Sequence, residues 1–461
     1  MPVTVVNMMP KSLSGERQQD SEPNIAVNPE NPLQIVGTAF TPDPLNGPRA
    51  PIFVSSDGGA TWSLRTIVPG GPATADISVG FGDRGGALYA GTLNFSTFNL
   101  NVLRTANPFA VTPMTLLVNR PDEDQPWVSA ATAGTGAGRD RVYVGHNNFN
   151  AAPRTASVEV SRNARTGPAP AGFASRRVER RDNVGQDGPP VRTAVHSDGT
   201  VYAAFHRWVR NLPSGPLDFA IDVVVVRDDD GGAGTAPFRD LVDSGDNVAG
   251  RRVARNRFVR FTASTGPLGQ ERIGADLSIA VDPSNSDRVW LAWCDRVGGA
   301  TGTDWTVHVR RSTNRGRTWS ADRRTITNAK NPALAVNAQG VTGLMFQRLR
   351  GTGAARRWVT VLELTKNAWQ TEPTRHVLHT ALANDPPRQF LPYLGDYIRL
   401  LAVGDDFYGV FSGSNRPDTA NFPSGISYQR NANWTTHTLL RTDNSTPVPV
   451  SIDPFFVHHI P

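Results

Sequence analysis

Short apolar runs follow one another along the whole chain, and turns rich in Gly, Pro, Asn or Asp separate them. Runs such as ASVEV and TVHVRR alternate apolar and polar residues, which is the period of a half-buried β-strand. The 43 Gly and 36 Pro residues are scattered rather than clustered, as expected when turns join many short strands. No apolar stretch reaches the roughly eighteen residues that a membrane-spanning helix needs. The pattern therefore predicts an all-β fold with no membrane span.

One four-strand pattern recurs along the chain. Its clearest copies begin as EPNIAVNPENPLQIVGTAF at Glu22 and ADLSIAVDPSNSDRVWLAWCD at Ala275, each predicted to form a strand, a hairpin and a second strand. Looser copies begin at residues 75, 124, 189, 331 and 395, and each is followed by a loop, a third strand, a turn and a fourth strand. Four antiparallel strands repeated radially make a propeller blade. We therefore predict a seven-bladed β-propeller of four-stranded antiparallel blades, with six blades as the alternative.

The predicted organisation is one propeller domain over residues 1–461. The blades are expected at residues 20–70, 74–119, 122–182, 187–243, 274–327, 329–380 and 391–440. The last blade takes its third strand from GISYQ, and RNANWT is a short remnant of the turn motif. Residues 441–461 are expected to supply a strand that closes the ring. VTVV is the spare strand at the other end of the chain. Residues 240–270 fit no strand of the repeat, so we interpret them as a long insertion.

Two nine-residue turns are nearly identical, SSDGGATWS at 55–63 and STNRGRTWS at 312–320. Asp57 can accept hydrogen bonds from turn amides, the glycines permit the turn, and Trp62 covers the space between strands. These turns match the Asp-box, or BNR repeat, with Asn314 replacing the acid in the second copy. On these motifs the chain resembles the sialidase-like superfamily of β-propellers. In that superfamily the boxes lie on the face opposite the active site, so neither Asp57 nor Trp62 is placed in a site.

Composition narrows the choice of partner only slightly. The formal net charge is +6, and the positive charge is almost entirely arginine, a side chain that binds carboxylate, sulfate or phosphate through paired hydrogen bonds. An anionic ligand is one interpretation, and ordinary surface charge is the other. No dense basic run contains interleaved aromatics, so nucleic acid is not an expected partner. The single cysteine, Cys294, excludes an internal disulfide, and the first residues do not match a secretory signal.

Candidate site residues come from the face on which the innermost strand of each blade begins. The strand starts supply a near-ring of polar side chains: Glu22, Asp76, Asp124, Asp276, Asn331 and Asp396. The ends of the second strands and the loops after them add histidines, arginines and a Trp. From these we select as catalytic candidates Asp396, Tyr397, His206, His146 and Asp295, and as substrate-binding candidates Arg192, Arg207, Trp208, Arg296, Arg348 and Arg399. Each has a structural alternative, such as turn capping for the acids and packing for Trp208.

The resemblance implies a carbohydrate-active protein that recognises, and in its enzymatic form cleaves, a glycosidic bond in an anionic glycan. It also implies an arginine triad, a Tyr–Glu nucleophile pair and an F/Y-R-I-P motif, and this chain lacks that motif. The group nearest to a Tyr–acid–Arg cluster is Tyr397 with Asp396 and Arg399. Seven-bladed polysaccharide lyases, which use His and Tyr as base and acid, are a second enzymatic alternative. A non-catalytic glycan- or protein-binding propeller, including an effector or structural module, is the third.

No cofactor or metal ligand set is predicted, although a Ca²⁺ ion in the central channel is an alternative use of the carboxylates. The expected partner is a glycan, and the expected assembly is a monomer. The missing signal leaves a cytoplasmic location or export by a non-Sec route.

Overall fold

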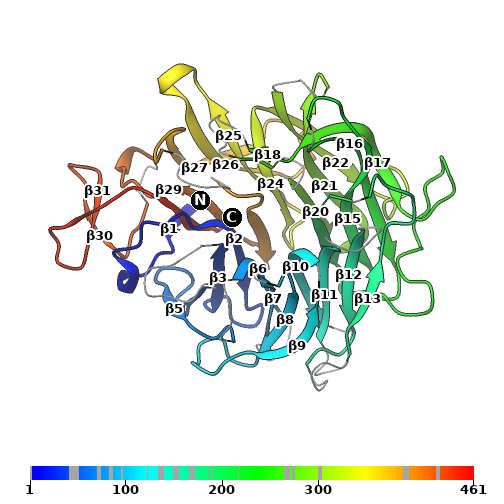
Figure 1. The fold of residues 1–461 in the computed structure, drawn as a ribbon, viewed down its shortest axis with the longest axis horizontal. Helices are drawn as coiled ribbons and strands as arrows, with labels where there is room; N and C mark the ends of the chain where they lie inside the picture. Colours follow the sequence, from blue (N-terminus) through cyan, green and yellow to red (C-terminus); the bar gives the residue numbers. More distant parts are fainter. Residues whose placement is uncertain are drawn as a thin grey trace.

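The chain folds into a seven-bladed β-propeller, in which seven four-stranded antiparallel sheets are arranged around a central axis (Figure 1). The computed structural model describes residues 3–40, 51–69, 74–82, 87–94, 97–121, 123–132, 140–148, 155–165, 172–185, 187–188, 190–215, 217–263, 270–272, 276–299, 304–387, 394–421 and 426–461. The seven sheets confirm the larger of the two predicted blade numbers. No helix in these ranges is long and apolar enough to cross a membrane.

Six sheets each use four consecutive strands, ordered from the axis outwards. The first two sheets contain β2 (Ser21–Val27), β3 (Ile35–Phe40), β4 (Ile52–Ser55) and β5 (Ser63–Arg65), then β6 (Thr74–Phe81), β7 (Leu88–Asn94), β8 (Leu100–Thr105) and β9 (Thr115–Arg120). The next two contain β10 (Glu123–Thr132), β11 (Asp140–Asn148), β12 (Ala156–Ser161) and β13 (Ala174–Arg177), then β14 (Val191–Val195), β15 (Val201–Asn211), β16 (Asp218–Asp228) and β17 (Arg251–Arg260). The fifth and sixth contain β20 (Leu277–Asp282), β21 (Asn285–Val297), β22 (Asp304–Ser312) and β23 (Arg324–Thr327), then β24 (Ala329–Val336), β25 (Thr342–Arg350), β26 (Arg357–Thr365) and β27 (Thr374–Leu382).

The seventh sheet closes the ring with strands from both ends of the chain. Its order is β28 (Arg399–Val403), β29 (Asp406–Ser414), β33 (Ile452–His459) and β1 (Val3–Asn7), and Val5 pairs with Val457 across the outer strands. The prediction that GISYQ supplies its third strand is therefore wrong, because β33 occupies that position. The intervening strands β30 (Asn431–Asn433), β31 (Thr438–Leu440) and β32 (Pro447–Val448) form a separate three-stranded sheet at the side of the molecule (Figure 1).

The segment interpreted as a long insertion also differs from its prediction. Strand β17 lies within it and is the outermost strand of the fourth sheet. It escaped recognition because its sequence, RRVARNRFVR, carries five arginines and so lacks the apolar signature of a strand. An edge strand tolerates such a sequence, since one edge faces solvent and charge there discourages pairing with other chains. Only the short strands β18 (Thr262–Ala263) and β19 (Gln270–Glu271) form an extra two-stranded sheet.

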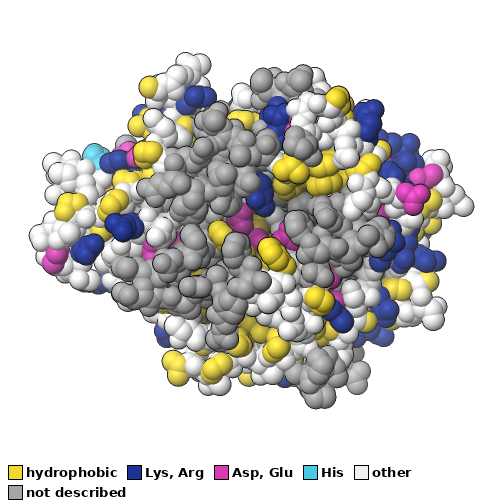
Figure 2. Space-filling view, in the orientation of Figure 1, with side chains coloured by type: hydrophobic (Ala, Val, Ile, Leu, Met, Phe, Trp, Pro, Cys, Tyr) yellow, Lys and Arg dark blue, Asp and Glu magenta, His cyan; other side chains and the backbone are white. Residues whose placement is uncertain are grey.

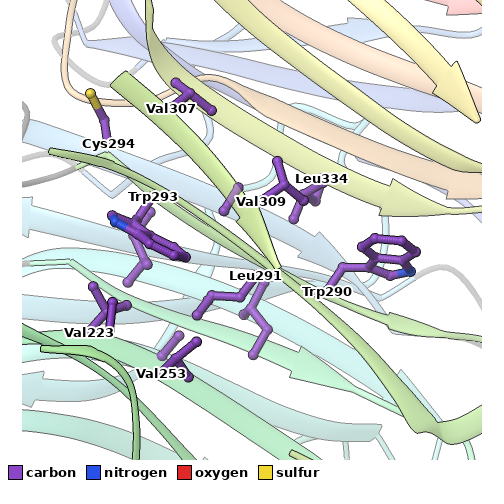
Figure 3. Close-up of a cluster of buried hydrophobic side chains, with 14 of the residues drawn as sticks. Val223, Val253, Trp290, Leu291, Trp293, Cys294, Val307, Val309 and Leu334 are labelled. Atoms are coloured by element: carbon purple, nitrogen blue, oxygen red, sulfur yellow. The ribbon is translucent and has the colours of Figure 1, made fainter. Parts of the chain in front are cut away.

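The core lies between neighbouring blades, because each sheet is apolar on both faces. In the fifth blade, Leu291 and Trp293 of β21 point toward Val223 and Val253 of the fourth blade (Figure 3). The alternate residues of β21 point the other way and pack toward β24, where Leu334 lies. This alternation is the two-residue period of a strand that is buried on both sides. Rigid packing of this kind fixes the positions at which the innermost strands begin, and the candidate site lies there.

Within the described ranges, 3₁₀ turns lie at Lys11–Leu13, Gly353–Ala355 and Thr419–Asn421. The innermost strands β2, β6, β10, β14, β20, β24 and β28 all begin on one face of the ring, which we call the channel face. It is the face seen in Figure 2, where acidic side chains and a basic side chain are visible near the middle.

Candidate functional site

A cluster of charged and polar side chains fills the centre of the channel face. We call it the channel cluster, and its members are Glu22, Asp76, Asp124, Gln125, Arg192, Arg272, Asp276, Lys330, Asp396 and Tyr397. They come from all seven innermost strands or the segments just before them. Most of them are buried, whereas Asp124 and Arg272 are partly exposed. The ring geometry alone brings these residues together, since they span most of the chain.

Three of the innermost strands begin with an unusual backbone. Glu22, Gln125 and Asn331 have φ values of 53°, 49° and 53°, and each precedes a proline. Positive φ is uncommon for residues other than glycine, and for side chains as long as Glu and Gln it carries strain. A break in the strand register accompanies it in β2, β10 and β24. The bulge redirects side chains at the start of the strand.

Asp396 is the hub of the cluster. Its Oδ2 atom lies 2.6 Å from the Arg272 guanidinium and accepts a hydrogen bond of 2.7 Å from Nε2 of Gln125. The backbone amide of Asp396 donates to Oε1 of Glu22 at 3.2 Å. The Lys330 ammonium donates to the carbonyl oxygen of Gly395, the preceding residue, at 2.8 Å. The basic members of this group are therefore already bound to the protein.

Four carboxyl groups of the cluster, those of Glu22, Asp124, Asp276 and Asp396, have raised pKa values. Burial raises the pKa of Glu22 well above its ordinary value, and the nearby Asp396 and Asp76 raise it further. Burial also raises the pKa of Asp124 to about 7, with the charge of Asp76 adding to the effect. The pKa of Asp276 is raised to about 7 by burial against the opposing charge of Lys330. Asp124 and Asp276 thus change protonation near neutral pH, which is the range that acid–base chemistry needs.

Aromatic rings form one wall of the cluster. The hydroxyl of Tyr397 donates to Oδ1 of Asp76 at 3.1 Å, and its ring meets Trp127 edge to face at 5.5 Å. The guanidinium carbon of Arg192 lies 4.2 Å from the centre of the Trp127 ring and 5.1 Å from that of Tyr397. Burial lowers the pKa of Arg192 to about 10, so the guanidinium keeps its charge at neutral pH. The aromatic faces stabilise this buried cation.

Two members of the cluster have polar atoms that the protein does not satisfy. Oδ1 of Asp396 and the Nε and Nη1 atoms of Arg192 are buried and make no hydrogen bond to any residue that the structure describes. Gln125 links the two residues, because its amide nitrogen donates to Asp396 while its oxygen accepts from Arg192 at 3.4 Å. Unsatisfied buried groups cost free energy, so their retention calls for an explanation. An unsatisfied acceptor and two unsatisfied donors, linked through one amide, are complementary to a ligand that both donates and accepts hydrogen bonds.

The structure brings together four of the eleven predicted site residues: Asp396, Tyr397, Arg192 and Arg399. The first three belong to the channel cluster. Arg399 lies beside it, 4.9 Å from the Trp127 ring centre, and donates to Asn24 Oδ1 and to the carbonyl oxygens of Val79 and Val128. Through these bonds, Arg399 holds together the innermost strands β2, β6 and β10.

His146 lies in a separate buried group. Its Nδ1 atom is 2.5 Å from Glu123, and its Nε2 atom is 3.8 Å from Glu159. Arg120 in turn contacts Glu159 at 3.0 Å. Each of these partners belongs to the second or third blade, and the side chain of His146 is fully buried.

His206, Arg207 and Trp208 occupy consecutive positions on β15 but do not form a site with the cluster. His206 is buried, and its backbone carbonyl accepts from Gly188. Arg207 donates to the carbonyl of Asp182 and pairs with Asp222 at 3.2 Å. Trp208 is 5% exposed and stacks on Phe219 with ring centres 3.6 Å apart. It therefore packs in the core, which was the alternative interpretation of this residue.

The remaining predicted residues lie on the fifth and sixth blades. Asp295 accepts from Nε1 of Trp293 at 2.9 Å and contacts Nε2 of His308 at 3.1 Å. Burial lowers the pKa of His308, but its hydrogen bonds to Asp295 and Asp322 outweigh this and raise it to about 9. Asp295 is therefore paired with a protonated imidazole. Arg296 is buried, and Arg348 donates to the carbonyl of Thr327 at 3.1 Å.

Four residues in the cluster or its aromatic wall were missed by the sequence reasoning: Gln125, Trp127, Lys330 and Arg272. The sequence does carry a signal for the first three. The phrases QPW and KNP have a proline at the same point of the blade repeat as the EP of the first blade. Arg272 had no such signal, because the segment before the fifth blade matched no element. Among the described residues, no group of three or more His, Cys, Asp or Glu side chains could hold a metal ion.

The two box turns lie at the other ends of the strands. Oδ1 of Asp57 accepts from the amide of Thr61 at 2.9 Å, and Nε1 of Trp62 donates to the carbonyl of Gly59 at 3.0 Å. In the second turn Asn314 and Trp319 make the equivalent bonds to Thr318 and Gly316. The turn hydrogen bonds are thus alike in both copies, as expected of a folding device.

Comparisons with known proteins find no matching family model and no matching curated protein. Solved structures with a similar fold include an α-L-arabinanase from Penicillium chrysogenum complexed with arabinobiose, at 11% identity and a TM-score of 0.42 over 98% of this chain and 97% of that one. Sqt1 from Chaetomium thermophilum matches at 12% identity and a TM-score of 0.43 over 86% and 81%. A Hadza microbial sialidase matches at 11% identity and a TM-score of 0.31 over 71% of each chain. Similarity at this level concerns the fold alone.

Proposed function

We propose that the channel cluster binds a glycan and cleaves a glycosidic bond. The observation that carries this proposal is the pair of unsatisfied groups that Gln125 bridges, Oδ1 of Asp396 and the Nε and Nη1 atoms of Arg192. Each sugar hydroxyl donates one hydrogen bond and accepts others, so the hydroxyls of one sugar can satisfy both the carboxylate and the guanidinium. The Trp127 and Tyr397 rings beside Arg192 give an apolar wall of the kind that ligand pockets combine with a few fixed polar groups.

Asp124 is the proposed acid–base residue. It is the partly exposed carboxyl of the cluster, and its pKa of about 7 lets it give or take a proton at neutral pH. A protonated carboxylic acid next to the leaving oxygen and a second carboxyl group on the other side of the sugar are what glycoside cleavage requires. We assign the second role to Asp76, which Tyr397 positions through its 3.1 Å hydrogen bond.

Tyr397 itself is not proposed as the nucleophile. Burial raises its pKa well above the ordinary value, and the neighbouring carboxylates Asp76 and Glu22 raise it further. A tyrosine in this environment keeps its proton and acts as a donor. The Tyr-nucleophile chemistry of sialidases is therefore a poor fit to this chain.

A strongly anionic substrate is also not required by the site. Arg272 pairs with Asp396, Lys330 binds a backbone carbonyl, and Arg399 binds Asn24 and two carbonyl groups. Arg192 alone would have to hold a substrate carboxylate, without the arginine triad that the resemblance implied. The proposed substrate class is therefore a glycan whose cleaved unit is recognised through hydroxyl groups.

The test is the release of reducing ends from a panel of neutral, uronic-acid and sialylated glycans. Wild type is compared with Asp124→Asn, Asp396→Asn and the control Asp443→Asn, which makes the same chemical change at a fully exposed turn. We expect Asp124→Asn to lower kcat/KM by about 10²–10⁴-fold and to remove a limb near pH 7 from its pH profile. Asp396→Asn should raise KM because it weakens hydroxyl recognition. Equal activity in all four proteins would contradict the assignment of this site.

The burial of the cluster favours one alternative, a propeller that binds a glycan without cleaving it. Asp396 is 0% and Glu22 is 4% exposed, so only the rim of the cluster meets solvent directly. Thermal stabilisation by one glycan, lost in Asp396→Asn and without release of reducing ends from any member of the panel, would establish this alternative. The absence of both effects with every glycan would reject both carbohydrate proposals.

A further inference from the structure

Two histidines face each other far from the channel cluster. His376 lies on β27, the outermost strand of the sixth blade, and His459 lies on β33, which closes the seventh. Their ring centres are 5.0 Å apart, and the ring planes are tilted by 52°. The contact therefore joins the ring-closing blade to its neighbour.

Neither histidine has its hydrogen-bonding capacity filled. His459 is 0% exposed, and neither of its ring nitrogens bonds to any residue within the described ranges. Nε2 of His376 is likewise buried without such a partner. The neighbouring His458 differs, because its Nε2 atom contacts Asp406 at 2.9 Å. Three unsatisfied imidazole nitrogens at one contact are costly to bury, and imidazole nitrogen is a common metal ligand.

A cavity of about 370 Å³ opens beside the pair, and His459 forms part of its wall. Val341, Leu364 and Phe407 supply apolar lining, while Asn337 and Glu372 supply oxygen atoms. The cavity is large enough for several water molecules. An ion held by the two imidazoles would therefore have water as a further ligand on the cavity side of His459.

We propose that His376 and His459 bind a divalent transition-metal ion such as Zn²⁺ or Ni²⁺. Two imidazoles that ligate one tetrahedral ion at the usual Zn–N distance of about 2.0–2.1 Å hold their ring centres roughly 5 Å apart, as these rings are. Imidazole suits Zn²⁺, Ni²⁺ and Cu²⁺, whereas Ca²⁺ and Mg²⁺ prefer oxygen ligands. Water in the cavity completes the coordination.

The ion would act as a cross-link at the ring closure. It connects β27 to β33, the strand to which β1 pairs, so it opposes separation of the last blade from the sixth. A ligand that binds only the folded state stabilises that state in proportion to its occupancy. The site is separate from the channel cluster, and its existence does not depend on glycan chemistry.

The test uses the full chain after treatment with a chelator and removal of the chelator. Zn²⁺ or Ni²⁺ is then titrated by calorimetry, and the thermal unfolding midpoint is measured with and without the ion. We expect one ion per chain and a midpoint raised by a few degrees. His376→Asn should weaken binding by at least about tenfold, because it removes one of two protein ligands. His376→Cys should retain binding, since thiolate is also a zinc ligand.

A histidine outside the pair provides the control. His196→Gln changes a histidine that contacts Asp198 and should leave both the affinity and the midpoint shift unchanged. Failure of wild type to bind either ion, or equal affinity in His376→Asn, would overturn the proposal. If His376→Asn proves unfolded by circular dichroism, His376→Cys decides the matter: binding supports the site, and loss of binding in a folded protein rejects it.

Discussion

The channel cluster and the box turns lie at opposite ends of the strands, and they treat polar groups in opposite ways. Around Asp57, the turn supplies short, local hydrogen bonds to Ser55 and Thr61, and the acid stays largely exposed. In the channel cluster the acids are buried together, and Asp396 and Arg192 keep polar atoms that no described residue satisfies. Both regions repeat because blades repeat, so repetition does not separate structural from functional residues.

What does separate structural from functional residues is whether their polar atoms have hydrogen-bond partners within the protein. A turn whose hydrogen bonds are all local stabilises the fold and needs no ligand. The channel cluster buries carboxyl groups with raised pKa values and holds Glu22 and Gln125 at positive φ. Both features lower the free energy of unfolding, and proteins tolerate such a cost at functional sites. Substitutions should therefore destabilise the protein at the boxes and leave it as stable or more stable in the cluster.

The largest expected effect on stability is at the first box. Trp62 is 2% exposed, packs edge to face on Phe456 at 5.4 Å and donates to Gly59. Trp62→Ala should lower the free energy of unfolding by about 3–5 kcal/mol, because it leaves a cavity between the first and seventh blades. Urea denaturation measures this change. Trp319→Ala, at the half-buried Trp of the second box, should cost less, and an equal cost would show that burial does not distinguish the two boxes.

The channel cluster should show the opposite sign. Asp276 has a pKa of about 7 in the folded protein, raised by burial from about 4, so its stabilising contribution is complete below pH 4 and is lost as the pH rises to 7. Asp276→Asn removes the charge while its side-chain oxygen can still accept from the amide of Asn331, which lies 2.7 Å from the native carboxylate. We expect the variant to be about 4 kcal/mol more stable than wild type at pH 8 and close to it near pH 3.5. Unfolding curves at the two pH values measure this, and a variant less stable at pH 8 would contradict the comparison.

The smallest effect is expected for the acid of the first box. Asp57→Ala removes the acceptor for the amide and hydroxyl of Thr61 and for the hydroxyl of Ser55. The loss should be about 1 kcal/mol, the usual value for a local side-chain cap. Glycan binding or cleavage at the channel face should not change. An altered KM or rate in this variant would show that the two ends of the strands are coupled.

Parts of the site could be predicted from the position of a residue in the repeat. Asp396, Tyr397 and Arg192 were found because strand starts on one face of a propeller must converge on the axis. His146, His206 and Asp295 were chosen by the same rule applied to the second strands, but their side chains make contacts within or beside their own blades. Residue type and strand end do not say toward which neighbour a side chain turns. The bulges that turn Glu22 and Gln125 were signalled only by the prolines after them.

The sequence by itself determined the period of the fold, because alternating apolar strands and glycine-rich turns are local properties. It also determined the box turns, whose hydrogen bonds span a few residues. Only the tertiary structure decided how the ring closes, since β1 and β33 meet from opposite ends of the chain. It likewise decided that Arg272, from a segment with no readable pattern, neutralises Asp396. Burial and charge pairing between distant residues depend on the whole ring, and no local pattern encodes them.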